Sequence, residues 1–174
     1  MESKAKILGH PIHPILITIP LGLFVAAVVF DLIALLTGEG TFARVAFWNI
    51  AGGIVGGLVA AIPGAIDWAN IPSNTRAKRI GAFHGLGNVA VVALFAVAWW
   101  LRRDDPGVVA TAPFVIALVA IGLGTVTGWL GGELVERLGV GVDEGAHLNA
   151  PSSLSGLPAS AQAGESLRER EVGS

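Results

Sequence analysis

The sequence predicts an all-α integral membrane protein built as a bundle of four transmembrane helices. Hydrophobic residues make up 53% of the 174 residues and charged residues only 14%, with a mean hydropathy of +0.69. Soluble proteins average about 45–50% apolar and about 25% charged residues. Four nearly charge-free runs are each long enough to cross a bilayer, which takes about 20 apolar residues. The links between these runs are short, so consecutive helices should be antiparallel neighbours.

The first helix is expected at residues 12–37. The apolar run starts near Ile7, passes Asp31 and continues as LIALLT. Lys4 and Lys6 precede the run, as they would in a cleavable signal peptide, but the run exceeds the roughly 7–15 apolar residues of a signal-peptide core. A His-Pro-x-His-Pro entrance is also not typical of such a signal. We therefore interpret the segment as a retained membrane helix.

Three further helices are expected at residues 45–66, 80–101 and 107–132. The links GEGTFAR, DWANIPSNTRAKR and RRDDP contain the Gly, Pro, Asn and Asp residues that turns use. These helices complete a four-helix transmembrane domain over residues 1–138. From residue 139 onward the chain is rich in Gly, Ser, Pro, Ala and Glu, which predicts a disordered, flexible polar tail over residues 139–174.

The orientation is predicted from the Lys and Arg residues near the helix ends, which favour the cytoplasmic side of a membrane. Six of these residues lie on the side of the two termini and three lie on the other side. The two groups are Lys4, Lys6, Arg76, Lys78, Arg79 and Arg137 on the first side, and Arg44, Arg102 and Arg103 on the second. We therefore expect a multi-pass protein with both termini in the cytoplasm.

Glycine spacing indicates how the helices pack. GGIVGG places Gly52 and Gly56, and likewise Gly53 and Gly57, at G-x-x-x-G spacing, which lets helix backbones approach closely in lipid. Packing inside the bundle is one interpretation, and a homodimer face on the second helix is the other. IHPILITIPLGLFVA and FHGLGNVAVVALFAVA open the first and third helices similarly. This likeness reflects either shared hydrophobic bias or two repeated helix hairpins related by an axis along the membrane normal.

Ionisable side chains gather on the predicted cytoplasmic side. All four histidines lie there, as do acidic residues at or beyond the ends of the second and fourth helices. These residues are His10, His13, His84, His147, Asp67, Glu133 and Glu136. A histidine beside a helix amino-terminus is held toward its neutral form, which can ligate a metal. Pro11 and Pro14 restrict the backbone angles of the residues before them, so the directions in which the His10 and His13 side chains leave the backbone are constrained.

Four motifs together resemble a known family. GHPIHPILITIPLGLFVAAVVFDL, PGAIDW, FHGLGN and GWLGGELVERLGVGV, which span about residues 9–142, are similar to the bacterial membrane family named domain of unknown function 2231. The positions that match the family pattern are His10, His13, Asp31, Asp67, His84, Gly131, Gly132 and Glu133. The family often has an aromatic residue and then a histidine where this chain has Glu136 and Arg137. The resemblance implies a bacterial inner-membrane protein. Members joined to Rieske-type iron–sulfur domains hint at redox work.

Three functions remain open at this stage. In the first, the polar residues bind a cofactor for membrane redox work: His13 and His84 as axial ligands of haem b, or a larger set holding a transition metal. The larger set is His10, His13, Asp67, His84 and Glu133. His84, about one turn inside its helix, is the best single candidate, whereas His147 in the tail is expected to be solvated.

In the second, the chain is a structural or assembly subunit without a cofactor, and its His and acidic residues form a hydrogen-bond network that closes the bundle. In the third, it is a small proton-coupled or metal transporter in which Asp31 relays a proton or charge together with Asp67 and His84. An acid at this position also suits a structural ion pair. The candidate partners are Arg44, Arg102 and Arg103.

The composition excludes several classes of function. The chain has no cysteine, which rules out disulfides, zinc-thiolate sites and iron–sulfur ligation within it. A scattered net charge of -2 does not suggest nucleic-acid binding. Ser3 and Ser73 are the only serines before the tail and neither lies in a catalytic motif, so the chain is not expected to be an enzyme by itself. The expected partners are the lipid bilayer, a second copy and a redox partner protein.

Overall fold

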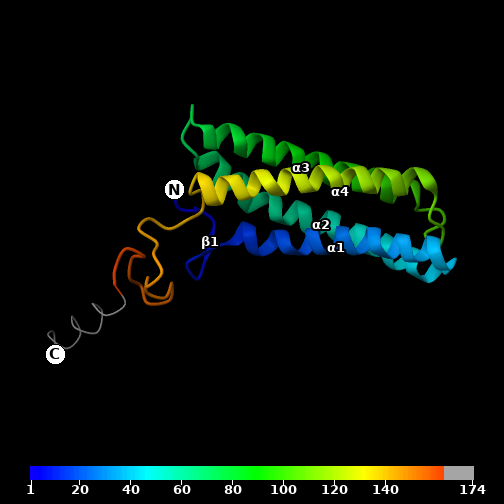
Figure 1. The fold of residues 1–174 in the computed structure, drawn as a ribbon, viewed down its shortest axis with the longest axis horizontal. Helices are drawn as coiled ribbons and strands as arrows, with labels where there is room; N and C mark the ends of the chain where they lie inside the picture. The colour runs from blue at the N-terminus through cyan, green and yellow to red at the C-terminus, as the bar shows by residue number, and fades with distance from the viewer. Residues whose placement is uncertain (163–174) are drawn as a thin grey trace.

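The computed structural model describes residues 1–162 and forms a four-helix bundle in which successive helices run antiparallel (Figure 1). All four helices are long and apolar enough to cross a membrane, which confirms the predicted fold class. The helices are α1 (Ile12–Thr37), α2 (Gly40–Asn70), α3 (Arg76–Leu101) and α4 (Thr111–Gly132), and α4 runs on into a π-helical turn, η1 (Glu133–Arg137). A short antiparallel hairpin, β1 (Lys6–Ile7) with β2 (His10–Pro11), precedes α1.

Two helices extend beyond their predicted spans, where charged or polar residues continue the helix past its apolar stretch, whereas α4 begins at residue 111 rather than at the predicted 107. α1 has the predicted bounds and is capped by Gly38, whose φ of 75° is the left-handed conformation that favours glycine. α2 spans residues 40–70 rather than 45–66, because a link of only two residues joins it to α1. α3 begins at residue 76 rather than 80, since the Thr75 side chain accepts a hydrogen bond from the Lys78 amide and caps the helix.

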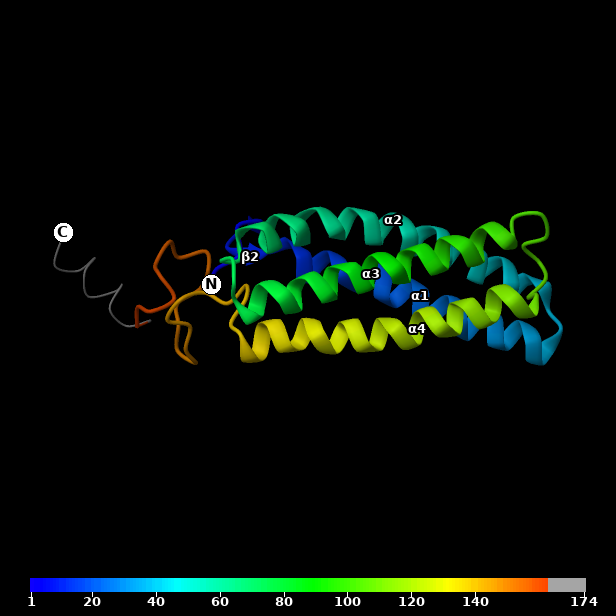
Figure 2. The ribbon, with the colours of Figure 1, turned by 90° about the horizontal axis from the view of Figure 1, so that it is seen from above.

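The bundle consists of two helix hairpins, α1 with α2 and α3 with α4, which lie side by side in both views (Figures 1 and 2). Equivalent positions of α1 and α3 meet across the bundle. The Phe24 and Phe95 rings stack with centroids 3.9 Å apart, and these residues have the same separation, 71 residues, as the ion pair of Asp31 and Arg102. These two contacts relate α1 to α3 by the same offset, as the predicted repeat requires.

Small residues let the helices of this core approach closely. A Cβ on Gly53 would lie 2.5 Å from Cε1 of Phe24, and one on Gly57 would lie 2.9 Å from Cγ2 of Val92. The core around Phe24 and Phe95 is otherwise built from four alanines, Ile50 and Val91. The GGIVGG glycines thus pack inside the bundle, as one of the two interpretations predicted, and the homodimer face stays a prediction.

The segment after η1 lies against the N-terminal segment. The Gly141 amide donates to the Met1 carbonyl at 2.9 Å, and the Met1 amino group donates to the carbonyl of Gly139 at 3.0 Å. Residues 138–162 contain no helix or strand, in agreement with the predicted polar tail, and residues 163–174 of that tail lie outside the described part of the chain. The N-terminal segment and the tail therefore lie at the same end of the bundle (Figure 1).

Candidate functional site

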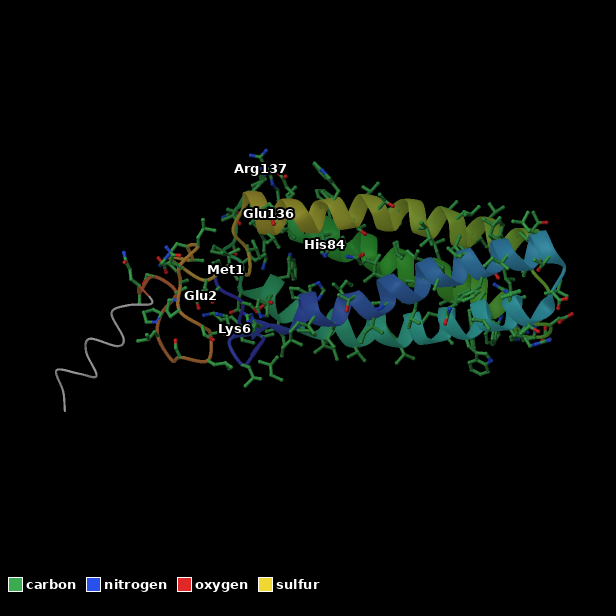
Figure 3. All side chains as sticks on the ribbon, turned by 60° about the horizontal axis from the view of Figure 1, so that its bottom comes forward. Met1, Glu2, Lys6, His84, Glu136 and Arg137 are labelled. Atoms are coloured by element: carbon green, nitrogen blue, oxygen red, sulfur yellow. The ribbon has the colours of Figure 1, made fainter. Side chains whose placement is uncertain are left out.

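The two ends of the bundle carry different polar groups. We call the end where α1 and α3 begin the histidine end, because it holds His13 and His84, and the opposite end the arginine end, because it holds Arg102. The N-terminal segment and residues 138–162 also lie at the histidine end (Figure 3). The histidine end is the candidate functional site.

His13 lies in the first turn of α1, and its ring packs against bare backbone of α2. Its Nδ1 lies 2.8 Å from the carbonyl oxygen of Ala60. Gly64, one turn further along α2, leaves room for the ring, since a Cβ there would lie 2.8 Å from Nδ1 of His13. A carbonyl only accepts hydrogen bonds, so Nδ1 of His13 carries a proton and donates it, and in the neutral form of such a ring the free lone pair is on Nε2.

His84 repeats this arrangement in the second hairpin. Its Nδ1 lies 2.8 Å from the carbonyl oxygen of Thr127 on α4, and a Cβ on Gly131, one turn later, would lie 3.0 Å from its Cε1. The side-chain amide of Asn88 lies 3.1 Å from Nε2 of His84. The Thr127 hydroxyl in turn lies 2.9 Å from the Asn88 side-chain oxygen, to which it donates. His84 is therefore held at both ring nitrogens.

The two imidazole rings face each other across the bundle. Their centroids are 6.3 Å apart, and the ring planes meet edge to face at 86°. The two histidines differ at Nε2: among residues 1–162, no protein group hydrogen-bonds to Nε2 of His13, whereas Nε2 of His84 accepts from Asn88. The two histidines thus share the Nδ1 contact to a backbone carbonyl and differ only in the hydrogen bonding of Nε2.

The other residues of the predicted metal set have partners elsewhere. The Asp67 carboxylate accepts from the Ser3 hydroxyl at 2.7 Å and from the Lys4 amide at 2.7 Å, so it fastens the N-terminal segment to α2. Glu133 pairs with Arg76 at 2.6 Å. His10 is exposed and lies 3.2 Å from the Ser153 hydroxyl in the tail.

The described residues therefore do not assemble the five-membered metal set. Within residues 1–162, no group of three or more His, Asp or Glu side chains could hold a metal ion. His147 is exposed, as expected for the tail, and its ring contacts the Ala161 carbonyl. What the structure does bring together is the pair predicted for haem, His13 and His84.

Several residues that shape the pair were not selected from the sequence for this role. They are the two residues whose carbonyls accept from the rings, the glycine one turn after the first carbonyl, and the side-chain amide on α3, namely Ala60, Thr127, Gly64 and Asn88. Asn88 carried a usable signal, because it follows His84 by one helical turn and is the only other polar side chain in the apolar run 80–101. Gly131 matched the family pattern, and the structure gives it a physical role.

Asp31 belongs to a different site, at the arginine end. Its carboxylate accepts from the Arg102 guanidinium at 2.7 Å, with side-chain exposures of 0% and 1%. Arg102 also donates to the Ala43 carbonyl at 3.0 Å. The predicted structural ion pair is confirmed for Arg102, and a charge relay through Asp31 stays a prediction.

Outside the membrane spans, one ionic link joins the N-terminal segment to the tail. Lys6 donates to the Asp143 carboxylate, and this hydrogen bond raises the pKa of Lys6 above its ordinary value. The hydrogen bond from Lys6 to Glu2 lowers the pKa of the Glu2 carboxyl. Both shifts favour the charged forms, so the link is fully formed near neutral pH.

Comparison with known proteins gives one match. A scan against protein-family models matches residues 9–144 to a family described as "Predicted membrane protein (DUF2231)". Searches of curated proteins and of solved structures find no match. The matched residues include all four helices and the histidine pair.

Proposed function

The chain belongs to the DUF2231 family of predicted membrane proteins, and we propose that it is a membrane redox protein that binds a haem b between His13 and His84. The observation that supports this is the shared orientation of the two rings, each with Nδ1–H on a backbone carbonyl of its own hairpin. A metal-ligating histidine almost always donates its other ring N–H to a carbonyl, carboxylate or water. Both rings are therefore oriented as ligating histidines are.

Haem suits these two histidines better than a bare metal ion does, because among residues 1–162 no third His, Asp or Glu joins them in a group that could hold a metal. Zinc sites typically take three or four protein ligands, whereas haem brings four ring nitrogens of its own and needs the protein for axial ligation. A transition-metal ion held by only these two imidazoles, with its other positions left to water, is the second form of the same proposal. A bound haem supplies one-electron chemistry, and the protein supplies the ligands and their apolar surroundings.

Ligation by His84 requires one local change. Asn88 occupies Nε2 of His84 at 3.1 Å, so its side-chain amide must turn away when that nitrogen binds iron. Nε2 of His13 has no such competitor among the described residues. If a haem were bound, His13 and His84 would be the residues that hold it, and His84 would do so only with the Asn88 amide turned away from its Nε2.

The location and partners of this function are also proposals. The excess of Lys and Arg at the histidine end supports a cytoplasmic orientation for that end, in the inner membrane of a bacterium. A redox partner protein would approach from the cytoplasm, and a second copy could pack against exposed helix faces in the membrane.

The alternative is a structural or assembly role without a cofactor. It is supported by the complete hydrogen bonding of His84, which joins α3 to α4 through Thr127 and Asn88. A proton-coupled or metal transporter has less support, because Asp31 is neutralised by Arg102. These roles differ from the haem proposal in what the purified protein contains.

The deciding experiment is an absorption spectrum with elemental analysis of protein purified in detergent from cells supplied with haem and metals. We expect a Soret band that is lost in both His13→Ala and His84→Ala but kept in His10→Ala and His147→Ala, the two histidines outside the pair. A stoichiometric metal without a Soret band would select the metal form. Colourless, metal-free protein would contradict both forms and favour the structural role, which partner co-purification would then test.

A further inference from the structure

The hairpin before α1 has an unusual turn. Ile7 pairs with His10, and the two residues between them, Leu8 and Gly9, have φ of 50° and 83°. Two successive positive φ values define the two-residue turn for which Asn-Gly is the common sequence. Gly9 suits this turn, but leucine rarely adopts a left-handed conformation. The tip of the hairpin is therefore strained at Leu8.

The same tip exposes two large aliphatic side chains. Leu8 is 73% exposed and Ile7 is 56% exposed, even though the tail residue Ser153 packs against Gly9. In water, both the strain at Leu8 and the exposure of the two side chains are unfavourable. In lipid, the exposed side chains would be favourable, because apolar surface there leaves water.

The hairpin is fixed next to a membrane span. The Ile12 amide, at the start of α1, donates to the Ala5 carbonyl at 2.8 Å, and Asp67 holds Lys4 from α2. In Figure 1 the hairpin lies at the end of α1 on the side away from α3 and α4. Its tip is therefore close to the depth at which α1 enters the bilayer.

We propose that Ile7 and Leu8 form an interfacial anchor that inserts into the bilayer beside the start of α1. A lipid surface, rather than a protein partner, suits this tip because α1 itself presents exposed aliphatic side chains such as Ile15 and Ile19 to lipid. The Lys6 ammonium group pairs with the Asp143 carboxylate of the tail. In this arrangement the charged pair stays in water while Ile7 and Leu8 enter the lipid. The anchor fixes the N-terminal segment over the histidine end and is independent of any cofactor.

The test uses the absence of native cysteine, so that one introduced cysteine carries one spin label. Leu8→Cys is labelled in the full chain, reconstituted in bilayers of phosphatidylcholine and phosphatidylglycerol. Its collision rates with oxygen, which concentrates in lipid, and with a water-soluble nickel chelate are compared with two references. Leu58→Cys, 60% exposed in the middle of α2, gives the lipid reference, and Leu148→Cys, fully exposed in the tail, gives the water reference.

We expect the Leu8 label to fall on the lipid side of the midpoint between the two references. A value on the water side would overturn the proposal. A second variant separates anchoring from folding: Ile7→Cys is labelled with and without Leu8→Asn, because asparagine tolerates the turn but removes the aliphatic group. A shift of the Ile7 label toward water, at unchanged helicity, supports the anchor, and an unchanged label position overturns the role of Leu8.

Discussion

At the residue scale, Gly64 and Gly131 leave the space that His13 and His84 need to reach the backbone carbonyls of the neighbouring helix. We expect Gly131→Ala to weaken the protein, because the added Cβ would lie 3.0 Å from Cε1 of His84 and overpacking typically costs about 1–3 kcal/mol. Gly128→Ala, on the same helix, is the matched control, since nothing lies within 4 Å of its Cβ and the better helix propensity of alanine gains up to about 1 kcal/mol. Thermal unfolding in detergent should give opposite shifts. Equal shifts would show that Gly131 does not position His84.

Asn88 separates the haem proposal from the structural alternative. In Asn88→Leu, Nε2 of His84 loses the group that lies 3.1 Å away. If the pair binds haem, the variant keeps its Soret band and binds haem at least as tightly, because no amide competes with iron. If the pair is only a hydrogen-bond network, the variant loses about 0.5–1.5 kcal/mol per hydrogen bond removed and gains nothing in haem binding. Haem titration and thermal unfolding on the same samples decide between them.

At the element scale, the Asp31–Arg102 pair joins α1 to α3 at the arginine end. Both side chains are buried, and removing one partner of a buried ion pair costs about 3–5 kcal/mol, because the other charge stays unpaired. Arg102→Met should therefore destabilise the bundle strongly, and the double variant with Asp31→Leu should recover most of the loss. Arg103→Met is the control, since its partner Asp104 is 86% exposed and such pairs contribute about 0–1 kcal/mol. Chemical denaturation measures the free energy of unfolding of each variant. If the loss in the double variant equals the sum of the losses in Arg102→Met and Asp31→Leu, the two side chains are not directly coupled.

The link between the N-terminal segment and the tail has a predictable pH range. The pKa of Lys6 is raised by Asp143, so its contribution is complete below the ordinary lysine pKa and is lost as pH rises through the higher folded value. The pKa of Glu2 is lowered by Lys6, so its contribution is lost as pH falls through the lower folded value. A spin label at Val142→Cys should be immobile at pH 7 and mobile at both extremes. With Lys6→Met the label should be more mobile at pH 7 than in the unchanged chain, and equal mobility would contradict the link.

For the whole molecule, hydropathy predicted the four helices, because it depends on the residues within each helix. The similar openings of the first and third helices placed His13 and His84 at similar depth, which predicted the histidine pair. The helix ends were missed where Arg44 and Arg76 extend a helix beyond its apolar run, since hydropathy detects the embedded part only. The five residues of the predicted metal set are not brought together in residues 1–162, for another reason. The groups that engage Asp67 are Ser3, Lys4 and Ala5, and no local pattern links positions so far apart in sequence.

The orientation of the whole bundle decides which side of the membrane a cofactor between the histidines would serve. Six Lys and Arg residues flank the helices at the histidine end and three at the arginine end, so we expect the histidine end in the cytoplasm. Leu148→Cys and Asp104→Cys report on the two ends, because both positions are highly exposed. A membrane-impermeant maleimide should label Asp104→Cys in spheroplasts and reach Leu148→Cys only after permeabilisation. The reverse pattern would place the histidine pair nearer the outer surface, and electrons would then enter or leave the site on that side.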